Sequence, residues 1–382
     1  MDRKQVVLSA EETLRQRDFE RKLADIHRQR SRAPLALVDT FGCQQNVADS
    51  QHIMGMLQAM GCEFTDEADR ADIIVLNTCA IRDHAEKRVF GNLGALTHTK
   101  KKNPEQIIGL CGCMANQKHV VEKLRKSYPY VDLVFGVDGI DTLPQLIAQK
   151  LQKHKRVLME PAQRPVIVEN IPIRRESEFR AWLPIMYGCD NFCTYCIVPY
   201  VRGREKSRPF EEIVDEVTGL VRQGVREITL LGQNVNSYGR DLFGKPRFAD
   251  LLRAVGDTGV ERIFFTSSHP KDLLPETIDA MAETPAVMPQ LHLAVQSGST
   301  RILKEMNRRY TREDYLGLVD RIRNRMPDIA LSTDIIVGFP GETEEDFEQT
   351  LSLAETVRYA QAYTFIYSKR AGTPAAEIYD PT

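Results

Sequence analysis

The chain has 382 residues, of which 42% are hydrophobic and 27% are charged, and its formal net charge is −2 at pH 7. This composition is typical of a globular protein long enough for two domains, and it neither indicates nor excludes a nucleic-acid partner. A run of about 18 apolar residues and the apolar core of a secretion signal are both lacking, so we expect neither a membrane span nor export. We therefore expect a cytoplasmic protein whose eight cysteines are metal ligands or structural thiols.

Residues 1–33 mix nine basic with six acidic side chains, and we interpret them as an N-terminal helical extension. From residue 34 onward, short apolar runs alternate with amphipathic stretches, a pattern typical of parallel α/β structure. Residues 34–152 predict a doubly wound parallel-sheet domain with strands at 35–39, 72–77, 106–112 and 131–135. Helices are predicted between these strands, at 47–60, 83–99 and 115–126.

Residues 153–182 contain three prolines and little periodicity, so we expect a linker there. A second βα series, residues 183–382, has predicted strands at 183–187, 227–231, 262–266, 290–295, 330–337 and 362–367. Six βα units are two short of a closed TIM barrel. The sequence therefore predicts an incomplete (β/α)6 barrel with an open side that suits a bulky substrate.

A compact cysteine motif follows the first strand of this second series. Cys189, Cys193 and Cys196 have the spacing C-x3-C-x2-C. Three thiolates can hold three irons of a cubane cluster and leave the fourth iron open for a small molecule. A structural zinc site needs a fourth protein ligand, and the stretch 182–208 contains no further Cys or His. The motif therefore favours an iron–sulfur cluster over zinc or buried structural thiols.

Three other cysteines, Cys43, Cys79 and Cys113, each come just after a predicted strand of the first domain. The carboxyl ends of parallel strands meet at one edge of a sheet, where open α/β folds bind ligands. We therefore expect these three thiols to converge, although free cysteine is also a common buried residue. Cys62 follows a helix and Cys111 lies inside a strand, so we assign both to packing.

Polar residues also follow other strands of the second series. The triplet 232–234 follows the second strand, 267–270 follows the third, 296–298 follows the fourth, and Asp334 lies within the fifth. Each alone is equally consistent with turn chemistry, but their shared position at strand ends favours a cofactor site. The candidate cofactor-binding residues are Gly232, Gln233, Asn234, Gln296 and Asp334.

Longer motifs point to one family. The chain carries, in order, DTFGCQQN at 39–46, NTCAIRD at 77–83, CGCMA at 111–115 and GCDNFCTYCIVPYVRGRE at 188–205. Further along it has LLGQNVNSYG at 230–239, SSHP at 267–270, LAVQSGS at 293–299, MNRRYTREDY at 306–315 and STDIIVGFPGETEEDF at 332–347. In these motifs it resembles the methylthiotransferases, a family of radical S-adenosylmethionine enzymes, and among them the branch that modifies tRNA. The resemblance covers nearly everything from residue 34 to the end.

The resemblance implies two [4Fe–4S] clusters and S-adenosylmethionine as cofactors. An auxiliary cluster would be bound by Cys43, Cys79 and Cys113, and a radical-generating cluster by the three cysteines from 189 to 196. The implied reaction converts isopentenyl-adenosine beside the tRNA anticodon to its 2-methylthio derivative. One S-adenosylmethionine methylates sulfur on the auxiliary cluster, and a second supplies the radical for sulfur insertion at carbon-2. Because an aromatic C–H bond is beyond general-base chemistry, we expect no catalytic side chains besides the cluster ligands.

The resemblance also implies partners. These are tRNA, an electron donor such as flavodoxin or ferredoxin, and a sulfur source, with the protein acting as a monomer away from membranes. Arg202 and Arg204, in a basic run after the cysteine motif, are candidates to contact the splayed target base or its phosphates. Family members generally continue into a small C-terminal β-domain called TRAM, which helps to bind tRNA. This chain stops at Thr382, so we expect it to lack that domain.

Two alternatives stay open at this point. The first is a methylthiotransferase that acts on an aspartate of a ribosomal protein. The second is an iron–sulfur protein without catalysis, either an electron carrier or an RNA-binding module.

Overall fold

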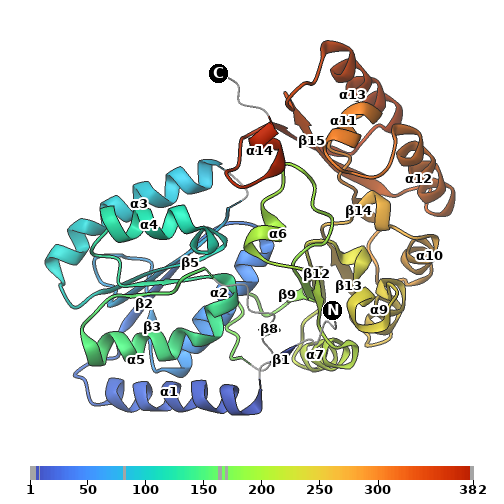
Figure 1. Ribbon diagram of the computed structural model, residues 1–382. Helices are drawn as coiled ribbons and strands as arrows, with labels where there is room; N and C mark the ends of the chain where they lie inside the picture. Colours follow the sequence, from blue (N-terminus) through green and yellow to red (C-terminus); the bar gives the residue numbers. More distant parts are fainter. Residues whose placement is uncertain (1–5, 8, 81–82, 162–165, 168–170, 379–382) are drawn as a thin grey trace. The chain divides into compact units, whose positions relative to one another are not determined.

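The computed structural model describes residues 6–7, 9–80, 83–161, 166–167 and 171–378 (Figure 1). Parts of the expected N-terminal extension and linker, and the last four residues, lie outside this set. The chain divides into two compact units. The first comprises Met1–Glu176 together with Tyr200–Gly203, and the second comprises Ser177–Pro199 together with Arg204–Thr382.

The first unit is built on a parallel sheet of six strands in the order β3-β2-β4-β5-β6-β7. Four were predicted, and the structure has them as β2 (Leu35–Phe41), β4 (Ile73–Thr78), β5 (Ile107–Gly112) and β6 (Leu133–Phe135). The prediction of four strands missed the two edge strands, β3 (Glu63–Phe64) and β7 (Val157–Leu158). Each has only two residues, too few to produce an apolar run, and each pairs with one neighbour. β7 lies within the segment expected to be a linker.

Helices cover both faces of this sheet (Figure 1). One core cluster joins the strands to α3 (Asp83–Lys102) and α4 (Lys118–Ser127). The other joins them to α1 (Ala10–Arg28), α2 (Gln44–Ala59) and α5 (Leu143–Lys153). Because apolar helix faces bury both sides of a parallel sheet, the predicted doubly wound architecture is confirmed.

The N-terminal helix α1 is part of this core. Ser9 caps it, since its hydroxyl accepts a hydrogen bond from the backbone N–H of Glu12 at 3.1 Å. Leu23 is buried in the core cluster, and the His27 ring bonds the carbonyl of Met60 through Nδ1 at 2.7 Å. Ahead of α1, β1 (Val6–Val7) pairs in parallel with β8 (Val166–Ile167).

The second unit holds six parallel strands that follow one another in chain order. They are β9 (Arg180–Pro184), β12 (Glu227–Leu231), β13 (Arg262–Phe265), β14 (Gln290–His292), β15 (Ala330–Val337) and β16 (Gln361–Ile366). They form two three-stranded sheets. Two isolated bridges connect the sheets, one between Ile263 and Val287 and one between Ser268 and Leu293. The predicted incomplete barrel of six strands is therefore confirmed.

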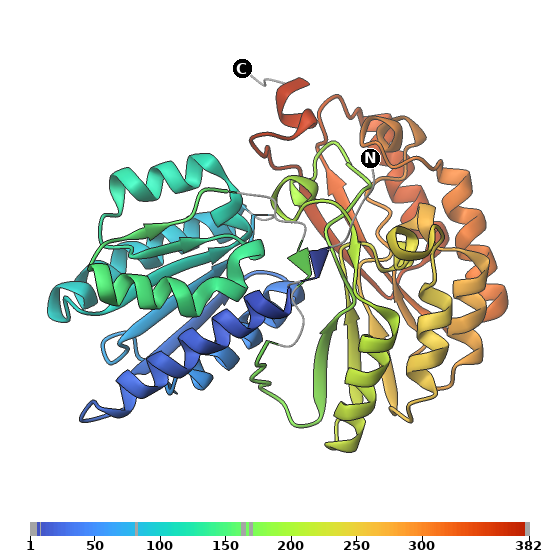
Figure 2. The same ribbon diagram turned by 60° about the horizontal axis from the view of Figure 1, so that its bottom comes forward.

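The longer helices of this unit lie along the outer face of the curved sheet, from yellow-green to red-orange in Figure 2. They are α7 (Phe210–Arg222), α9 (Phe248–Gly256), α10 (Pro275–Glu283), α12 (Arg312–Arg325) and α13 (Glu344–Val357). Their apolar faces form one core with the strands. The connections hold the short helices α6 (Val198–Val201), α8 (Arg240–Phe243), α11 (Thr300–Glu305) and α14 (Pro374–Ile378).

A short antiparallel pair brackets the compact cysteine motif. β10 (Met186–Tyr187) precedes the motif and pairs with β11 (Lys206–Ser207), which follows it. Across the part of the chain that the structure describes, no helix combines the length and hydropathy needed to cross a membrane.

Candidate cluster and cofactor sites

Strand register brings three cysteines to the carboxyl edge of the first unit's sheet. Phe41 of β2 lies opposite Thr78 of β4, and Thr78 lies opposite Gly112 of β5. One or two residues beyond these positions come the cysteines predicted to converge, Cys43, Cys79 and Cys113. Their thiols interact: Cys79 hydrogen-bonds Cys43, and the charge of Cys43 acts on Cys113.

The electrostatics of this edge favour a thiolate. The hydrogen bond from Cys79 and the nearby charge of Arg202 lower the pKa of Cys43 to about 5. Burial raises the pKa of Cys113, although Arg202 opposes that effect. Because the thiolate is the form that binds a metal, an edge that already stabilises one thiolate suits a metal cluster.

Gly112 permits the close approach of β4 and β5 at this edge. Its φ is +94°, and a Cβ built there would lie 2.4 Å from the carbonyl oxygen of Thr78. The Thr78 hydroxyl donates to the carbonyl of Cys111 at 2.5 Å, and the N–H of Cys79 donates to the carbonyl of Phe41 at 2.9 Å. A side chain at Gly112 would therefore separate the turn that carries Cys79 from the one that carries Cys113.

A buried amide pair supports Cys43 from behind. The Asn77 amide donates to the Asn46 carbonyl at 2.8 Å and to the Ser50 hydroxyl at 2.9 Å, while the Asn46 amide donates to Asn77 Oδ1 at 3.1 Å. Asn46 Oδ1 also accepts the backbone N–H of Cys43 at 3.4 Å, so Cys43 is the N-cap of α2. Sequence reasoning missed both asparagines as supporting residues, although each lies within a quoted motif.

The two cysteines assigned to packing, Cys62 and Cys111, lie in a hydrophobic core cluster. Burial raises the pKa of Cys62 to about 12 and that of Cys111 well above its usual value. Both thiols are therefore neutral and shielded, as a structural role requires.

The compact motif forms a loop after β10 that is tied to the segment before α12. Asn307 donates through its amide to the carbonyls of Asn191 and Phe192, at 3.3 and 2.9 Å. Thr194 donates its backbone N–H to the carbonyl of Met306 at 3.1 Å. Phe192 and Asn307 both have positive φ, of 48° and 57°, so two left-handed residues shape the contact.

Arg308 is the charged neighbour of this loop. Its guanidinium donates to Cys193 Sγ at 3.5 Å, to the hydroxyl of Tyr310 at 3.0 Å and to the carbonyl of Ala294 at 2.6 Å. Tyr195, Tyr310 and Cys193 hold the pKa of the buried Arg308 well above its usual value despite desolvation, so it remains charged. Sequence reasoning missed Arg308; the motif MNRRYTREDY was the available signal.

Burial dominates the titration of two thiols of this loop, Cys189 and Cys196. It raises the pKa of Cys196 to about 12, with a further contribution from Cys193, and it also raises the pKa of Cys189. Such thiols ionise only when a strong positive charge binds them, which iron supplies. The donor set therefore fits a cluster.

Within the described residues, no three His, Cys, Asp or Glu side chains are arranged to hold a single metal ion. A cubane binds each thiolate to a different iron, so its ligands lie farther apart than those of one zinc ion. A site for one metal ion is therefore not what the predicted clusters require.

The turns after β12 and β13 present buried polar atoms without partners. Asn234 donates its amide to Asp272 Oδ2 at 2.8 Å, which fixes the amide orientation because a carboxylate only accepts. Among the described residues, Asn234 Oδ1 and Gln233 Oε1 then lack a donor. Gly232 keeps this turn tight, since a Cβ there would lie 2.6 Å from Met186 Cγ. Buried unpaired oxygens at a strand end indicate a ligand that brings N–H donors.

His269, in the turn after β13, presents a hydrogen-bond donor instead of an acceptor. Its Nδ1 accepts the backbone N–H of Lys271 at 3.2 Å, so the neutral ring carries its proton on Nε2. Burial and the nearby Arg308 lower the pKa of His269, which keeps the ring neutral. Among the described residues, Nε2 has no acceptor. Two acceptor oxygens and one donor on neighbouring turns are complementary to an α-amino acid, with its ammonium and carboxylate groups.

Gln296 follows β14, and Asp334 lies within the neighbouring strand β15. Gln296 has φ +72°, donates its N–H to the carbonyl of Asp334 at 2.9 Å and accepts from the N–H of Ile336 at 2.8 Å. A non-glycine residue held in this conformation is characteristic of a functional turn. The Asp334 carboxylate lies 3.5 Å from His292 Nε2, a residue that sequence reasoning missed.

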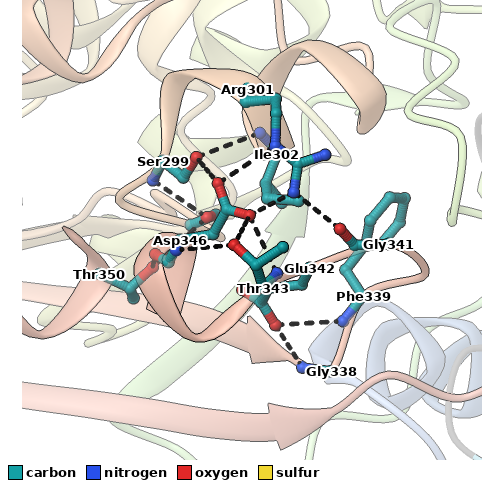
Figure 3. A network of polar contacts seen from close by, with 11 residues as sticks. Ser299, Arg301, Ile302, Gly338, Phe339, Gly341, Glu342, Thr343, Asp346 and Thr350 are labelled. Atoms are coloured by element: carbon teal, nitrogen blue, oxygen red, sulfur yellow. Dashed lines mark hydrogen bonds and ion pairs between the residues drawn. The ribbon is translucent and has the colours of Figure 1, made fainter. Parts of the chain in front are cut away.

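A polar network joins the turn after β14 to the turn after β15 (Figure 3). At its centre, the buried Asp346 accepts from the hydroxyl of Ser299 at 2.6 Å, from the N–H of Thr343 at 2.9 Å and from the Arg301 guanidinium. Arg301 also donates to the carbonyl of Gly341 at 2.7 Å. Ser299 caps α11 and Thr343 caps α13, so one carboxylate holds both helix starts in place. Asp346 was also missed from the sequence.

The two arginines expected at a tRNA interface differ in their surroundings. Arg202 lies inside the first unit with its side chain 4% exposed, ion-paired to Asp49 at 2.7 Å. This does not fit the expected phosphate contact, because a phosphate-binding guanidinium must reach the surface. Arg204, in the second unit, is 55% exposed and forms a two-point contact with Asp190 at 2.6 and 3.0 Å.

Comparison with known proteins adds independent findings. Residues 183–354 match the family described as the Radical SAM superfamily, and residues 36–136 match the uncharacterized protein family UPF0004. Among solved structures, the radical S-adenosylmethionine methyltransferase TsrM from Kitasatospora setae aligns over 90% of this chain and 75% of its own, with a TM-score of 0.65. The cobalamin-dependent enzyme OxsB aligns over 91% of this chain and 55% of its own, with a TM-score of 0.60. At 15% identity, both show the fold alone.

Curated relatives are much more similar in sequence. The tRNA-2-methylthio-N(6)-dimethylallyladenosine synthase of Acetivibrio thermocellus is 49% identical over 384 residues, which cover 99% of this chain and 80% of the relative. The synthase of the same name from Caldicellulosiruptor saccharolyticus is 54% identical over 340 residues, covering 89% of this chain and 72% of the relative. The chain therefore belongs to the tRNA-2-methylthio-N(6)-dimethylallyladenosine synthase family of radical S-adenosylmethionine proteins.

Proposed function

We propose that this chain is an enzyme that methylthiolates carbon-2 of isopentenyl-adenosine in tRNA, with two [4Fe–4S] clusters and S-adenosylmethionine. Two sets of three thiols at the carboxyl edges of two parallel sheets carry the proposal. Cys43, Cys79 and Cys113 hold the auxiliary cluster in residues 34–152. Cys189, Cys193 and Cys196 hold the other in residues 183–382. Residues 1–33 are an extension and residues 153–182 a linker in this division.

The cofactors supply the radical, sulfur and methyl chemistry, and the protein positions and shields them. Arg308 keeps a fixed positive charge beside Cys193, which stabilises the negative charge of a thiolate-bound cluster. Tyr310 and the carbonyl of Ala294 hold that guanidinium in place. The loop can therefore carry negative charge without exposure to water.

The turns after β12 and β13 would hold the methionine end of S-adenosylmethionine. Asn234 Oδ1 and Gln233 Oε1 would accept hydrogen bonds from its amino group, and His269 Nε2 would donate to its carboxylate. Gln296 and Asp334, whose backbones are hydrogen-bonded to each other, would contact the adenosine portion.

Replacement of His269 by alanine should weaken S-adenosylmethionine binding about tenfold, since it leaves a buried carboxylate oxygen of the ligand without its donor, which costs about 1–3 kcal/mol. Equilibrium dialysis of labelled S-adenosylmethionine against the anaerobic protein measures this. His269→Gln, which retains an N–H donor, should recover part of the affinity, and thermal unfolding checks that both variants fold. Equal affinity of His269→Ala and the parent protein would contradict the assignment.

Binding of tRNA should depend on Arg204. Replacement of Arg204 by alanine removes one phosphate contact, so the slope of log affinity against log salt should decrease by about 0.7 for a single-stranded loop. Arg226, also exposed and paired with Glu261, precedes β12 at the amino edge of the barrel strands, so Arg226→Ala serves as the control. Equal salt slopes for both variants would remove Arg204 from the interface.

The remaining partners belong to this proposal. The protein acts as a cytoplasmic monomer, takes electrons from a donor such as flavodoxin or ferredoxin, and is resupplied with sulfur by a separate donor.

Nucleoside mass spectrometry of tRNA from cells that lack this gene tests the function. Methylthio-isopentenyladenosine should disappear and isopentenyladenosine should accumulate, and only the intact gene should restore the modification. An unchanged level of the methylthio nucleoside, with loss of a methylthiolated aspartate from a ribosomal protein, would favour the other methylthiotransferase branch. Absence of S-adenosylmethionine cleavage by the reduced protein would favour a non-catalytic iron–sulfur protein.

A further inference from the structure

The segment that contains Arg202 belongs to the first unit, although the chain on both sides of it belongs to the second. Two contacts hold it there. Asn116, in the 3-10 turn Cys113–Asn116, donates its amide to the carbonyl of Val201 at 2.7 Å. Arg202 donates to Asp49 Oδ2 at 2.7 Å and, through Nε, to Cys113 Sγ at 3.2 Å. A stretch of chain close to Cys196 in sequence therefore brings a charge to the auxiliary thiols.

This charge is permanent and buried. The Arg202 and Asp49 side chains are 4% and 8% exposed. An arginine guanidinium stays protonated in proteins, so burial does not remove this charge. The same guanidinium donates one N–H to the Asp49 carboxylate and another to the Cys113 sulfur. The planar, branched head of arginine allows this geometry, and the ammonium group of lysine does not.

We propose that Arg202 is a positioning residue of the auxiliary site that sets its electrostatics, and that Asp49 orients it and partly offsets its charge. The inference rests on the proposed function, because it assumes a cluster at Cys43, Cys79 and Cys113. Hydrogen bonds to the sulfurs and nearby charge set the reduction potential of an iron–sulfur cluster. A cation beside Cys113 stabilises the more negative, reduced state and any anionic sulfur held there.

A simpler reading is that the Asp49–Arg202 pair only pins the segment to α2. The two interpretations predict different signs for the shifts in reduction potential that the two substitutions cause. If the pair is a pin, Arg202→Met and Asp49→Asn break the same contact and should act in the same direction. If the pair sets the electrostatics, Arg202→Met removes the positive group on the sulfur and lowers the potential. Asp49→Asn leaves the cation without its counter-ion and raises the potential.

The measurement is a reductive titration followed by electron paramagnetic resonance. The protein is the full chain with Cys189, Cys193 and Cys196 all changed to alanine, so that only the auxiliary site binds iron. We expect opposite shifts for Arg202→Met and Asp49→Asn. Arg202→Lys, which keeps the charge but not the Nε–H, should lie between Arg202→Met and the parent.

The matched control is Asp132→Asn. Asp132 is also buried and ion-paired, to Lys100 and Lys150 at 2.9 and 2.7 Å, but it precedes β6 at the opposite edge of the same sheet. It should leave the potential unchanged, while thermal unfolding reports how much each variant destabilises the fold.

The possible results distinguish a failure of the role proposed for Arg202 from a failure of the function proposed for the protein. Shifts of the same sign, or no shift, with normal iron content would overturn the role of Arg202 and leave the proposed function intact. If the background protein binds no iron, the auxiliary cluster and this inference both fail. The salt dependence of tRNA binding gives a second test, which also serves a variant that is too unstable for the titration. If Arg202→Met lowers the slope of log affinity against log salt as Arg204→Ala does, Arg202 contacts tRNA and the inference is wrong.

Discussion

Replacement of Cys193 by alanine should abolish the formation of 5′-deoxyadenosine and remove about four of about eight irons per chain. Each thiolate of the loop is expected to hold a different iron, so loss of one ligand opens a second iron and destabilises the cluster. Arg308 would also lose the sulfur to which it donates. Iron analysis and quantification of 5′-deoxyadenosine after anaerobic reduction with S-adenosylmethionine measure both effects.

The matched variant is Cys113→Ala in the first unit. It should lose a similar amount of iron but still cleave S-adenosylmethionine, while the methylthiolated nucleoside disappears. Cys62→Ala provides the control, because Cys62 is buried in the core of the same unit and should retain all the iron. If Cys193→Ala and Cys113→Ala lose the same activities, the two sites do not divide the work as proposed.

Replacement of Asp346 by alanine should lower the free energy of unfolding of the second unit by about 3 kcal/mol, because it leaves buried donors and an arginine without their acceptor. For a unit of this size, that corresponds to a decrease of about 6–12 °C in the melting temperature. Affinity for S-adenosylmethionine should fall as well, since Ser299 and Thr343 no longer hold the two turns together (Figure 3). Thermal unfolding by circular dichroism and equilibrium dialysis measure the two effects.

Asp314 is the control, because its side chain accepts from the backbone N–H of Thr311 in the same kind of capping box but at an exposed helix start. Asp314→Ala should cost about 1 kcal/mol and leave the affinity unchanged. Equal destabilisation by the two substitutions would show that Asp346 is no more than a helix cap.

The contribution of Asp346 to the stability of the second unit should depend on pH. The hydrogen bond from Arg301, with help from Ser299 and Thr343, lowers the pKa of Asp346 below its usual value. A carboxyl with a lowered folded-state pKa contributes its full stabilisation above the unfolded-state pKa of about 3.9 and loses it as the pH falls toward the folded-state pKa. The difference in stability between the parent and Asp346→Ala should therefore be constant above about pH 5 and shrink in more acidic solution.

Periodicity was a good guide to the interior of the fold and a poor one to its edges. β4 and β5 were predicted because a strand with helices on both faces must be apolar almost throughout. The edge strands β3 and β7 were missed, since their two-residue pairings depend on neighbouring backbone rather than on a side-chain pattern.

The residues of the candidate site also differ in how well the sequence predicted their positions. Strand order alone brought Cys43, Cys79 and Cys113 to one edge, because parallel strands share a direction and their ends must meet. Arg202 shows the limit of such reasoning. A basic residue after a cysteine motif reads as a surface charge until the position of Asp49 is known, and that contact spans most of the first unit's chain length.

The two α/β units, the two sets of three cysteines and the family could be predicted from the sequence, since spacing and residue type carry that information locally. The charges that lie beside those thiols could be identified only from the folded chain. Arg202 and Arg308 contact Cys113 and Cys193 across long separations in the chain. The unpaired groups of Asn234 and His269 likewise become visible only once every other polar contact around them is known. Burial and partner choice depend on the whole packed chain, because the free energy of a charge is set by all the groups that replace its water.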